Sequence, residues 1–324
     1  MTTEGAARKS DIQRAVAILR DGGLVAFPTE TVYGLGADAA NRDALRHLYA
    51  VKGRPSDHPV IVHLAGAEQL DDWAIEISSA ARTLAEAYWP GPLTLVLRRA
   101  SRVPDEVTGG LDTVGLRVPG HPLARELLTA FEGGLAAPSA NRFGRVSPTT
   151  AEAVRSELGD AVPLVLDGGE CTVGVESTIV DCASGPPRVL RVGGVTGEEL
   201  RALLGTDLPI GGGTRAPGTL ASHYAPRARV ELVAGNDLVE RGRELVGTGE
   251  RVGVLAGSEW RLELPSETVT LATPADADAY ARVLYAALRQ ADVLGLDVVL
   301  AVPPAPAGIG QAVADRLRRA ATPH

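Results

Sequence analysis

The stretch LVAFPTETVYGLG, residues 24–36, joins a short apolar run to a loop rich in polar, proline and glycine residues. LVAF (24–27) is typical of a buried strand, and Pro28 ends it because proline has no backbone N–H to donate within a sheet. Polar side chains that follow a buried strand are typical of α/β proteins, whose sites form where strands end. The stretch therefore predicts an α/β domain with a site beside its first strand.

Further helices and strands are predicted on both sides of this stretch, as far as about residue 205. The spacing of apolar residues predicts a helix at 12–20 with Asp11 as the N-cap, helices at 42–50, 78–89 and 122–131, and a helix to about Leu158 that begins with a capping box of Thr149 and Glu152. Short apolar runs predict strands at 93–97, 114–118, 164–166, 178–180 and 189–192. Strands and helices without strict alternation predict a mixed, twisted sheet.

Composition changes at residues 206–227, where glycine and proline interrupt any helical or strand period. This segment is typical of a linker between domains. Beyond it, apolar strands expected at 230–234, 252–257, 268–272 and 297–302 alternate with helices that begin near residue 237 and cover 276–291 and 309–320. The sequence thus predicts domains at 1–205 and 228–324, the second a small parallel sheet with covering helices.

Composition narrows the class of protein. The chain has 324 residues, enough for two domains, and its net charge of −8 argues against a surface for nonspecific nucleic-acid binding. We expect a cytoplasmic protein, because no apolar run approaches the roughly 18–20 residues that span a bilayer and the N-terminal residues lack the apolar core of a signal peptide. Two cysteines, Cys171 and Cys182, are too few for a disulfide framework or a zinc site.

Common nucleotide-binding and hydrolase motifs are absent from the sequence, including GxxxxGK[ST], GxGxxG after a strand, GxSxG and HExxH. Four polar loops stand out instead: PTETVYGLG (28–36), KGRPSDHPVIVHL (52–64), PSANRFGRVSPT (138–149) and GVESTIVD (174–181). Together they supply several cations and hydroxyls, which a triphosphate and a small amino acid both require. Any phosphate site in this chain is therefore expected to be assembled from separated loops.

Single residues in these loops also have structural interpretations. Serine and threonine before strands often cap turns, and His63 within an apolar strand is compatible with a core histidine. Arg117 and Arg191 lie inside apolar strands, where they have the alternative of pairing with structural carboxylates. The cluster of loops is stronger evidence for a site than any one member.

These segments resemble, in order, the YrdC-type threonylcarbamoyl-AMP synthases. The resemblance rests on PTETVYGLG, KGRP, WPGPLTLVL (89–97), GLRVPGHP (115–122), PSAN with SPT, and GVESTIVD followed by LRVGG (190–194). SHYAP (222–226) and GIGQAVADRLRRAA (308–321) resemble the long, two-domain form of that family. The resemblance implies an α/β fold with a YrdC-like twisted mixed sheet and a concave, positive active-site groove. It also implies a Rossmann-like C-terminal domain and a linker, 206–227, that closes over the active site.

The resemblance also implies a reaction. L-threonine, bicarbonate or CO2, and ATP with Mg²⁺ give L-threonylcarbamoyl-AMP and pyrophosphate, which makes the enzyme a nucleotidyltransferase. A separate transferase complex then moves the threonylcarbamoyl group to an adenosine of tRNA beside the anticodon. Neither membrane association nor stable tRNA binding is expected of the enzyme itself.

The same resemblance implies the site residues, each at the position of this sequence that matches the family's motif. The family's Lys-Arg-Ser-Asn signature, implied to be catalytic, is complete as Lys52, Arg54, Ser139 and Asn141. Positions that hold L-threonine are Thr31, His63, Arg117, Ala137 and Ser177. Positions that hold ATP are Arg54, His58, Thr113, Ser139, Ser147, Arg191 and, in the linker, Tyr224. No metal-ligating residue is implied.

Two positions depart from the family pattern. His58 stands where asparagine is usual in KGRPxxNP, and Phe143 replaces a small residue. An imidazole still donates one hydrogen bond, but its protonation is expected to make ATP affinity depend on pH near its reference pKa of roughly 6.5.

Two other functions compete with this interpretation. One is an RNA-binding or regulatory nucleotide-binding protein of the same fold, which the net charge and the 4% aromatic content weigh against. The other is a different adenylating or carbamoyl-handling enzyme, because related domains occur in hydrogenase-maturation carbamoyltransferases. Those proteins also carry acylphosphatase-like and zinc-finger segments, and this chain lacks the necessary cysteines.

Overall fold

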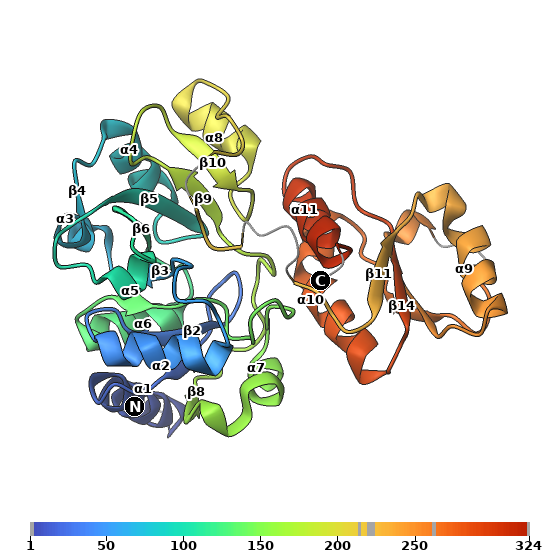
Figure 1. Ribbon diagram of the computed structural model, residues 1–324, viewed down its shortest axis with the longest axis horizontal. Coiled ribbons are helices and arrows are strands. Elements are labelled where there is room, and N and C mark those ends of the chain that lie inside the picture. Colours follow the sequence, from blue (N-terminus) through green and yellow to red (C-terminus); the bar gives the residue numbers. More distant parts are fainter. Residues whose placement is uncertain (1–2, 213–214, 219–223, 261–263, 323–324) are drawn as a thin grey trace. The chain divides into compact units, whose positions relative to one another are not determined.

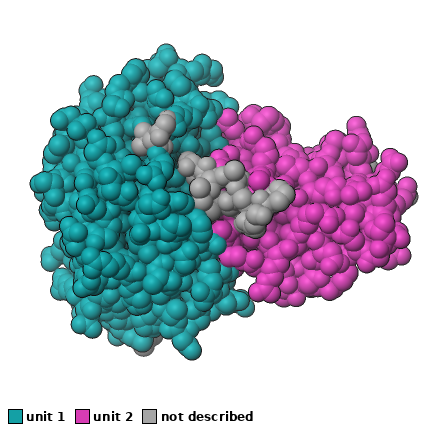
Figure 2. All heavy atoms as spheres, in the orientation of Figure 1, with its two compact units in different colours: residues 1–143, 148–172, 176–219 teal, residues 144–147, 173–175, 220–324 magenta. Residues whose placement is uncertain are grey.

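The computed structural model describes residues 3–212, 215–218, 224–260 and 264–322. The chain forms two compact units, shown in teal and magenta in Figure 2. Unit 1 comprises residues 1–143, 148–172 and 176–219, and unit 2 comprises 144–147, 173–175 and 220–324. The two short segments of unit 2 that interrupt unit 1 were not foreseen from the sequence, and the domain limits given above remain a prediction.

Unit 1 is built around a ten-stranded mixed sheet with the strand order β10-β9-β5-β6-β3-β7-β2-β1-β8, and with β4 paired to β5. This arrangement confirms the predicted α/β class with a mixed sheet. The strands are β1 (Val25–Phe27), β2 (Gly34–Asp38), β3 (Ile61–His63), β4 (Ala74–Ile75), β5 (Leu93–Arg99), β6 (Thr113–Arg117), β7 (Leu135–Ala136), β8 (Leu164–Val165), β9 (Thr178–Asp181) and β10 (Arg188–Arg191).

The helices of unit 1 agree with the predicted positions better than with the predicted caps. Pro122 begins its helix, as expected. Asp11 was wrongly predicted as an N-cap, because the polar residues before it continue the same helix. The helices are α1 (Thr3–Arg20), α2 (Arg42–Lys52), α3 (Leu70–Trp73), α4 (Ser79–Tyr88), α5 (Asp105–Thr108), α6 (Pro122–Phe131), α7 (Ala151–Leu158) and α8 (Gly197–Leu204), with 3₁₀ turns η1 (Ala67–Gln69) and η2 (Gly159–Ala161).

The predicted capping box of Thr149 and Glu152 is also wrong. The N-cap of α7 is Thr150, whose side chain accepts a hydrogen bond from the Ala153 N–H at 3.1 Å. Thr149 is buried instead, and its carbonyl accepts from the Cys171 N–H. A true capping box occurs at α8, where Thr196 and Glu199 each accept from the other's backbone N–H.

The central strands of this sheet have two different faces. Successive strand residues point to opposite faces, so Leu93, Leu95 and Leu97 of β5 belong to the core formed with α3, α4 and α8. Thr94, Val96 and Arg98 point the other way. We call this second face, which also bears a small apolar cluster of Ile61, Val96, Ile179, Leu190 and Ala216, the site face. Polar side chains at the strand ends flank that cluster, so the fold places the candidate residues on one surface.

Unit 2 contains a four-stranded, all-parallel sheet with the order β11-β14-β12-β13, which confirms the small parallel sheet predicted from the sequence. Figure 1 shows α9 on one side of this sheet and α10 and α11 on the other. Its elements are β11 (Arg229–Leu232), η3 (Gly235–Asp237), α9 (Leu238–Gly247), β12 (Val252–Leu255), η4 (Ser258–Trp260), β13 (Val269–Ala272), α10 (Ala277–Val293), β14 (Val298–Ala301) and α11 (Gly310–Ala320). Among the described residues of either unit, no helix is both long and apolar enough to span a membrane.

Candidate active site

Arg117 ends strand β6 and is almost completely buried, with 4% of its surface exposed. Its Nη2 lies 2.7 Å from Glu30 Oε1, and its Nε donates to the Gly91 carbonyl at 3.2 Å. The other oxygen of Glu30 accepts from the Gly120 N–H at 2.9 Å. A buried charge requires such a partner, so the structural ion pair considered from the sequence exists. Sequence reasoning missed Glu30, although it is the one charged residue in the loop PTETVYGLG.

The turn that carries Glu30 is organised by the hydroxyl of Thr29. This oxygen accepts from the N–H groups of Thr31 and Val32, both at 3.2 Å, and lies 2.8 Å from the hydroxyl of Thr31. The turn follows β1 directly. It carries Glu30, whose carboxylate contacts Arg117, with Thr31 next to it in the chain.

His63 ends strand β3 and pairs in register with Arg117 on one side and Leu135 on the other. Its ring packs edge-on against Phe27, and the Ala137 N–H donates to the Ile61 carbonyl beside it. Burial, reinforced by the charge of Arg117, lowers the pKa of His63 to about 3. The imidazole is therefore neutral at physiological pH. Its Nδ1 is buried and has no hydrogen-bond partner within the described part of the chain.

Ser177 immediately precedes strand β9 and meets residues from two other strands. Its hydroxyl lies 2.8 Å from that of Thr94, and Arg191 Nη2 donates to it at 3.1 Å. Arg191 also donates to the Ser177 carbonyl through Nε and Nη2, at 3.1 and 2.9 Å. A register shift between Val189 and Arg191 pairs Arg191 with Ile179, whose side chain belongs to the site face. Such a bulge re-aims a side chain, here a guanidinium.

Gly193 follows this arginine and permits a very close approach of two backbone segments. A Cβ at this position would lie 2.3 Å from the Glu176 carbonyl oxygen and 2.4 Å from the carbonyl carbon of Ser177. No side chain fits there without moving the backbone that carries Ser177. The glycine in LRVGG is thus required by the position of Ser177.

Lys52 is the last residue of α2, and Gly53 follows it in the left-handed conformation. Only 2% of Lys52 is exposed, and its Nζ donates to the carbonyl oxygens of Ser139 and Asn141. The Lys52 carbonyl in turn accepts from the Phe143 N–H at 2.8 Å. Burial, and the charge of Arg54, lower the pKa of Lys52 well below its ordinary value. The structure thus joins three members of the predicted signature, and it gives Lys52 a role in holding the 139–143 loop.

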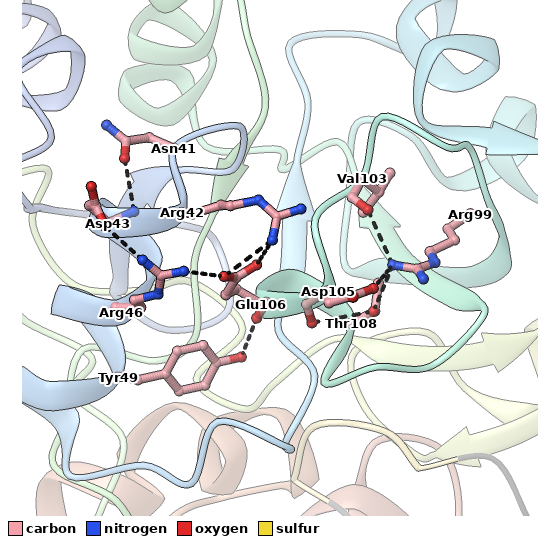
Figure 3. Close-up of polar contacts among 10 residues, drawn as sticks. All are labelled: Asn41, Arg42, Asp43, Arg46, Tyr49, Arg99, Val103, Asp105, Glu106 and Thr108. Carbon is pink, nitrogen blue, oxygen red and sulfur yellow. Dashed lines mark hydrogen bonds and ion pairs between the residues drawn. The ribbon is translucent and has the colours of Figure 1, made fainter.

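The rest of the loop at 54–60 is anchored to helices α2 and α5. Arg54 Nη2 donates to the Pro59 carbonyl at 2.8 Å. The hydroxyl of Tyr49 lies 2.8 Å from the His58 carbonyl. It also lies 2.9 Å from the Glu106 carbonyl (Figure 3). The pKa of His58 is lowered by burial and by Arg54, against the opposing charge of Asp57. The pH dependence expected from this histidine therefore moves below its reference pKa.

Two residues of the linker, Ala216 and Pro217, contact the site face of unit 1. Ala216 belongs to its apolar cluster, and the Pro217 carbonyl accepts from Arg191 Nη1 at 2.9 Å. Arg215 pairs with Asp57 at 3.1 Å. Beyond the cluster, the face opens into a cavity of about 430 Å³ lined by Arg98, Leu111, Asp112, Thr113, Asp181, Ala183, Ser184, Arg188 and Arg215. Of the predicted ATP residues, Thr113 is the one that lines it.

Two predicted ATP residues, Ser147 and Tyr224, belong to unit 2. Tyr224 has a positive φ of 64°, and its ring lies 5.3 Å from the guanidinium carbon of Arg316 and 5.7 Å from the ring centroid of Tyr285. Next to it, the Ala225 N–H donates to the Gly144 carbonyl at 3.1 Å. Both residues are therefore ordered within unit 2, and their contribution to the site stays a prediction.

The structure thus groups the predicted residues of unit 1 in two sets. His63 and Arg117 pair at the ends of β3 and β6, Ala137 donates to the Ile61 carbonyl of β3, and Ser177 lies across β5. Thr31 follows Glu30, the partner of Arg117. Lys52, Ser139 and Asn141 are linked directly, with Arg54 and His58 in the loop that follows Lys52. The unpredicted members are Glu30 and Thr94, which pair with Arg117 and Ser177.

Comparison with known proteins places this arrangement in a family. A family model described as "Telomere recombination" (Sua5/YciO/YrdC) matches residues 17–193, and one described as "Threonylcarbamoyl-AMP synthase, C-terminal domain" matches residues 195–322. The threonylcarbamoyl-AMP synthase of Pyrococcus abyssi is 42% identical over 323 residues, covering 95% of this chain and 93% of its own. That of Bacillus subtilis is 39% identical over 338 residues, covering 99% and 96%.

A solved structure gives the same answer for the fold. The crystal structure of Pyrococcus abyssi Sua5 complexed with L-threonine matches with a TM-score of 0.89 and 40% identity, covering 96% of this chain and 94% of that one. The matches extend over both family models and nearly the whole length of each relative. This chain therefore belongs to the Sua5/YciO/YrdC family, in the form that carries the C-terminal domain of threonylcarbamoyl-AMP synthases.

Proposed function

We propose that this chain synthesises L-threonylcarbamoyl-AMP from L-threonine, bicarbonate or CO2, and ATP, with release of pyrophosphate. The observation that carries the proposal is the buried guanidinium of Arg117 beside a neutral His63, on the sheet that also bears Arg191. Full-length relatives named threonylcarbamoyl-AMP synthase, and a similar structure complexed with L-threonine, support it.

Arg117 is suited to bind the carboxylate of threonine. Glu30 and Gly91 occupy its Nη2 and Nε, whereas Nη1 has no hydrogen-bond partner among the residues that the structure describes. A guanidinium fixed by two protein contacts presents its remaining N–H groups in a set direction. The neutral ring of His63 and the hydroxyls of Thr31 and Ser177 would then take the polar groups of the amino acid, with Ala137 beside its methyl group.

The chemistry requires positioning and charge neutralisation more than covalent catalysis. The threonine amine adds to CO2 and loses a proton to give a carbamate. A carbamate oxygen then attacks the α-phosphorus of ATP, and the bond to pyrophosphate breaks. Arg54 and Arg191 offset the charge that develops on the phosphates. Lys52 holds the loop that carries Ser139 and Asn141.

ATP would also contact His58, Thr113, Ser147 and Tyr224. Mg²⁺ suits this site as part of Mg-ATP, because that ion is commonly held by substrate phosphates and few protein ligands. Within the described ranges no group of three or more His, Cys, Asp or Glu residues is placed to hold a metal. When bound, the ion would neutralise phosphate charge.

The product is a mixed carbamic–phosphoric anhydride with AMP as its leaving group, so the enzyme is a nucleotidyltransferase. Such an anhydride suits transfer of its threonylcarbamoyl group to an amine, here the adenosine of tRNA, by a separate transferase complex. We place the reaction in the cytoplasm, which suits the two buried, unpaired cysteines Cys171 and Cys182.

The direct test measures pyrophosphate release from Mg-ATP with L-threonine and bicarbonate, leaving out each component in turn. Release that needs all three, together with the mass of threonylcarbamoyl-adenylate, is the expected result. Release with another amino acid but not with threonine would change the substrate. Folded protein that binds ATP without releasing pyrophosphate would favour a regulatory nucleotide-binding protein.

Substrate discrimination gives a sharper prediction. The hydroxyls of Thr31 and Ser177 are the groups proposed to meet the hydroxyl of the substrate, and a site that hydrogen-bonds a hydroxyl rejects analogues that lack it. A missing methyl group costs only about 1–3 kcal/mol in a pocket. Serine should therefore compete with threonine better than valine or 2-aminobutyrate does. Inhibition constants in the pyrophosphate assay measure this, and the opposite order would contradict the assignment of these hydroxyls.

A further inference from the structure

Phe143 contacts the loop that follows α2 at three points. Its backbone N–H donates to the Lys52 carbonyl at 2.8 Å. Its ring centroid lies 5.9 Å from the guanidinium carbon of Arg54 and 5.5 Å from the imidazole centroid of His58, at an interplanar angle of 62°. The side chain of Phe143 therefore meets two of the residues assigned to ATP, and its backbone meets Lys52, which is assigned to catalysis.

These contacts restrict two flexible side chains. A guanidinium near the face of an aromatic ring is attracted by the quadrupole of the ring, and an edge-on aromatic pair adds a second favourable contact. Arg54 also donates through Nη2 to the Pro59 carbonyl at 2.8 Å. The guanidinium is thus held from two sides before any ligand arrives. Side chains ordered in advance lose less conformational entropy when a ligand binds.

We propose that Phe143 is a positioning residue for the nucleotide, which holds the guanidinium of Arg54 and the ring of His58 in the orientation that meets the phosphates. This inference rests on the proposed function and deepens it, since it names what orients the phosphate-binding side chains.

The two contacting rings are also the two positions where this chain departs from the family pattern. His58 replaces an asparagine and Phe143 replaces a small residue. In the structure they pack against each other, with Arg54 on the same phenyl ring.

The test compares Phe143→Leu, which keeps bulk but removes the ring, with Phe143→Tyr, which keeps the ring. The affinity for Mg-ATP is measured by calorimetry, and KM for ATP and for threonine by pyrophosphate release. Phe143→Leu should weaken ATP binding and raise its KM by about three- to tenfold, the range that one cation–π contact and one aromatic pair suggest. Because Phe143→Tyr keeps the ring, its affinity and KM for ATP should remain within about twofold of wild type.

The threonine KM should not move in either variant. A matched control is Tyr88→Leu, which removes another half-buried aromatic ring of unit 1, at the end of α4. It should leave ATP affinity unchanged. Equal changes in both KM values, or an unchanged ATP affinity in folded Phe143→Leu, would overturn the proposal.

A double mutant tests whether Phe143 acts through Arg54. Lysine keeps the charge of Arg54 but loses the planar guanidinium that packs on the ring. In an Arg54→Lys background, Phe143→Leu should therefore have much less effect on ATP affinity than it has alone. Full additivity of the two changes would overturn the role of Arg54 in the proposal.

Calorimetry keeps this test separate from that of the proposed function. If the wild-type protein binds Mg-ATP without turnover, the reaction assignment fails while the variants still decide on Phe143. If it does not bind ATP at all, both proposals fail.

Discussion

At the scale of single residues, His63 shows how burial in this sheet is linked to pH. Its pKa is lowered to about 3 in the folded protein by burial and by Arg117, whereas an unfolded histidine titrates near pH 6.5. Between these values the unfolded chain binds more protons on this side chain. Its contribution to stability is therefore complete above about pH 6.5 and is lost as the pH falls.

The expected loss is about 2 kcal/mol of unfolding free energy between pH 6.5 and 5, at about 1.4 kcal/mol for each pH unit. Urea unfolding at the two pH values measures it. A His63→Gln variant should lack this part of the pH dependence. An exposed histidine of α2 provides the control, since His47→Gln should keep the wild-type slope. Equal slopes for wild type and His63→Gln would contradict the assignment.

Lys52 and Arg54 stand two positions apart, but their surroundings predict different mutant behaviour. Lys52→Ala leaves two loop carbonyls without their donor, which costs about 1–3 kcal/mol of unfolding free energy for each unsatisfied group. Arg54 is half-buried and holds one carbonyl, so Arg54→Ala should change stability by less than about 1.5 kcal/mol. Both variants should lower turnover at least about tenfold. Arg54→Ala removes charge at the phosphates, and Lys52→Ala releases the loop that carries Ser139 and Asn141.

Denaturant midpoints and pyrophosphate release, measured on the same preparations, separate the two effects. The expected pattern is lost activity in both variants and lost stability in Lys52→Ala alone. Near-normal turnover in both would remove these residues from the mechanism.

At the scale of elements, α2 and α5 together support the loop that contains Arg54 and His58. Glu106 of α5 pairs with Arg42 at 3.1 Å and Arg46 at 3.0 Å, and its carbonyl accepts from the Tyr49 hydroxyl (Figure 3). The same hydroxyl also reaches the His58 carbonyl of the loop. The arginines are mostly exposed, so their ion pairs contribute little, whereas the tyrosine is buried. The hydroxyl is therefore the more important tie.

Tyr49→Phe should lower the unfolding free energy by about 1 kcal/mol, the usual net value of one hydrogen bond. It should also raise the KM for ATP more than that for threonine, because the His58 carbonyl loses its partner. Glu106→Gln is the matched comparison on the same helix pair and should cost less than about 1 kcal/mol. Thermal unfolding and steady-state kinetics measure both. A larger effect of Glu106→Gln would reverse the ranking of the two contacts.

The sequence predicted elements where one physical signal dominated. Apolar runs identified β5, β6, β9 and β10, and Pro122 marked the start of α6. Strand β2, Gly34–Asp38, was not predicted from the sequence. Two of its five residues are glycine and few are apolar, so the alternation typical of a strand is not visible. The N-cap of α7 was misplaced by one residue because two threonines stand side by side and only tertiary packing buries Thr149.

Local sequence patterns could not predict the contacts between residues that are far apart in the chain. Glu30 and Arg117 are 87 positions apart, and Thr94 and Ser177 are 83 apart. A charged residue in an apolar strand predicts that a partner exists, but the sequence does not identify the partner without the strand order. The resemblance supplied the positions of the site residues, and the structure adds what holds those side chains in place.

At the scale of the whole molecule, the chain leaves unit 1 twice before its linker. Residues 144–147 and 173–175 are grouped with unit 2, and the first of these segments contains Ser147. A Cβ on Gly174 would lie 2.3 Å from the Ala281 carbonyl of α10, so this segment packs directly on that helix. Both segments therefore belong to the C-terminal unit, although they lie inside the first domain predicted from the sequence, 1–205.

Asp292, at the end of α10, joins the first of these segments to residues 227–228. Its Oδ2 pairs with Arg145 at 3.1 Å, and its Oδ1 accepts from the N–H groups of Arg227 at 2.6 Å and Ala228 at 3.2 Å. One carboxylate thus ties the loop of Ser147 to the chain that follows the linker. Hydrogen bonds to a charged group contribute about 1.5–3 kcal/mol each, so the tie is a strong one.

Asp292→Ala should release the 144–147 loop and raise the KM for ATP by about three- to tenfold. This range corresponds to the loss of one hydrogen bond to a charged group, partly replaced by hydrogen bonds to water. The KM for threonine should stay within about twofold, because Arg117, His63 and Ser177 belong to unit 1. Asp292→Asn keeps an acceptor oxygen, so its KM for ATP should lie between those of wild type and Asp292→Ala. Asp278→Ala, an exposed aspartate in the first turn of the same helix, is the matched control and should leave both constants unchanged. An ATP KM that stays at the wild-type value in folded Asp292→Ala would mean that the C-terminal unit holds this loop without setting the affinity for the nucleotide.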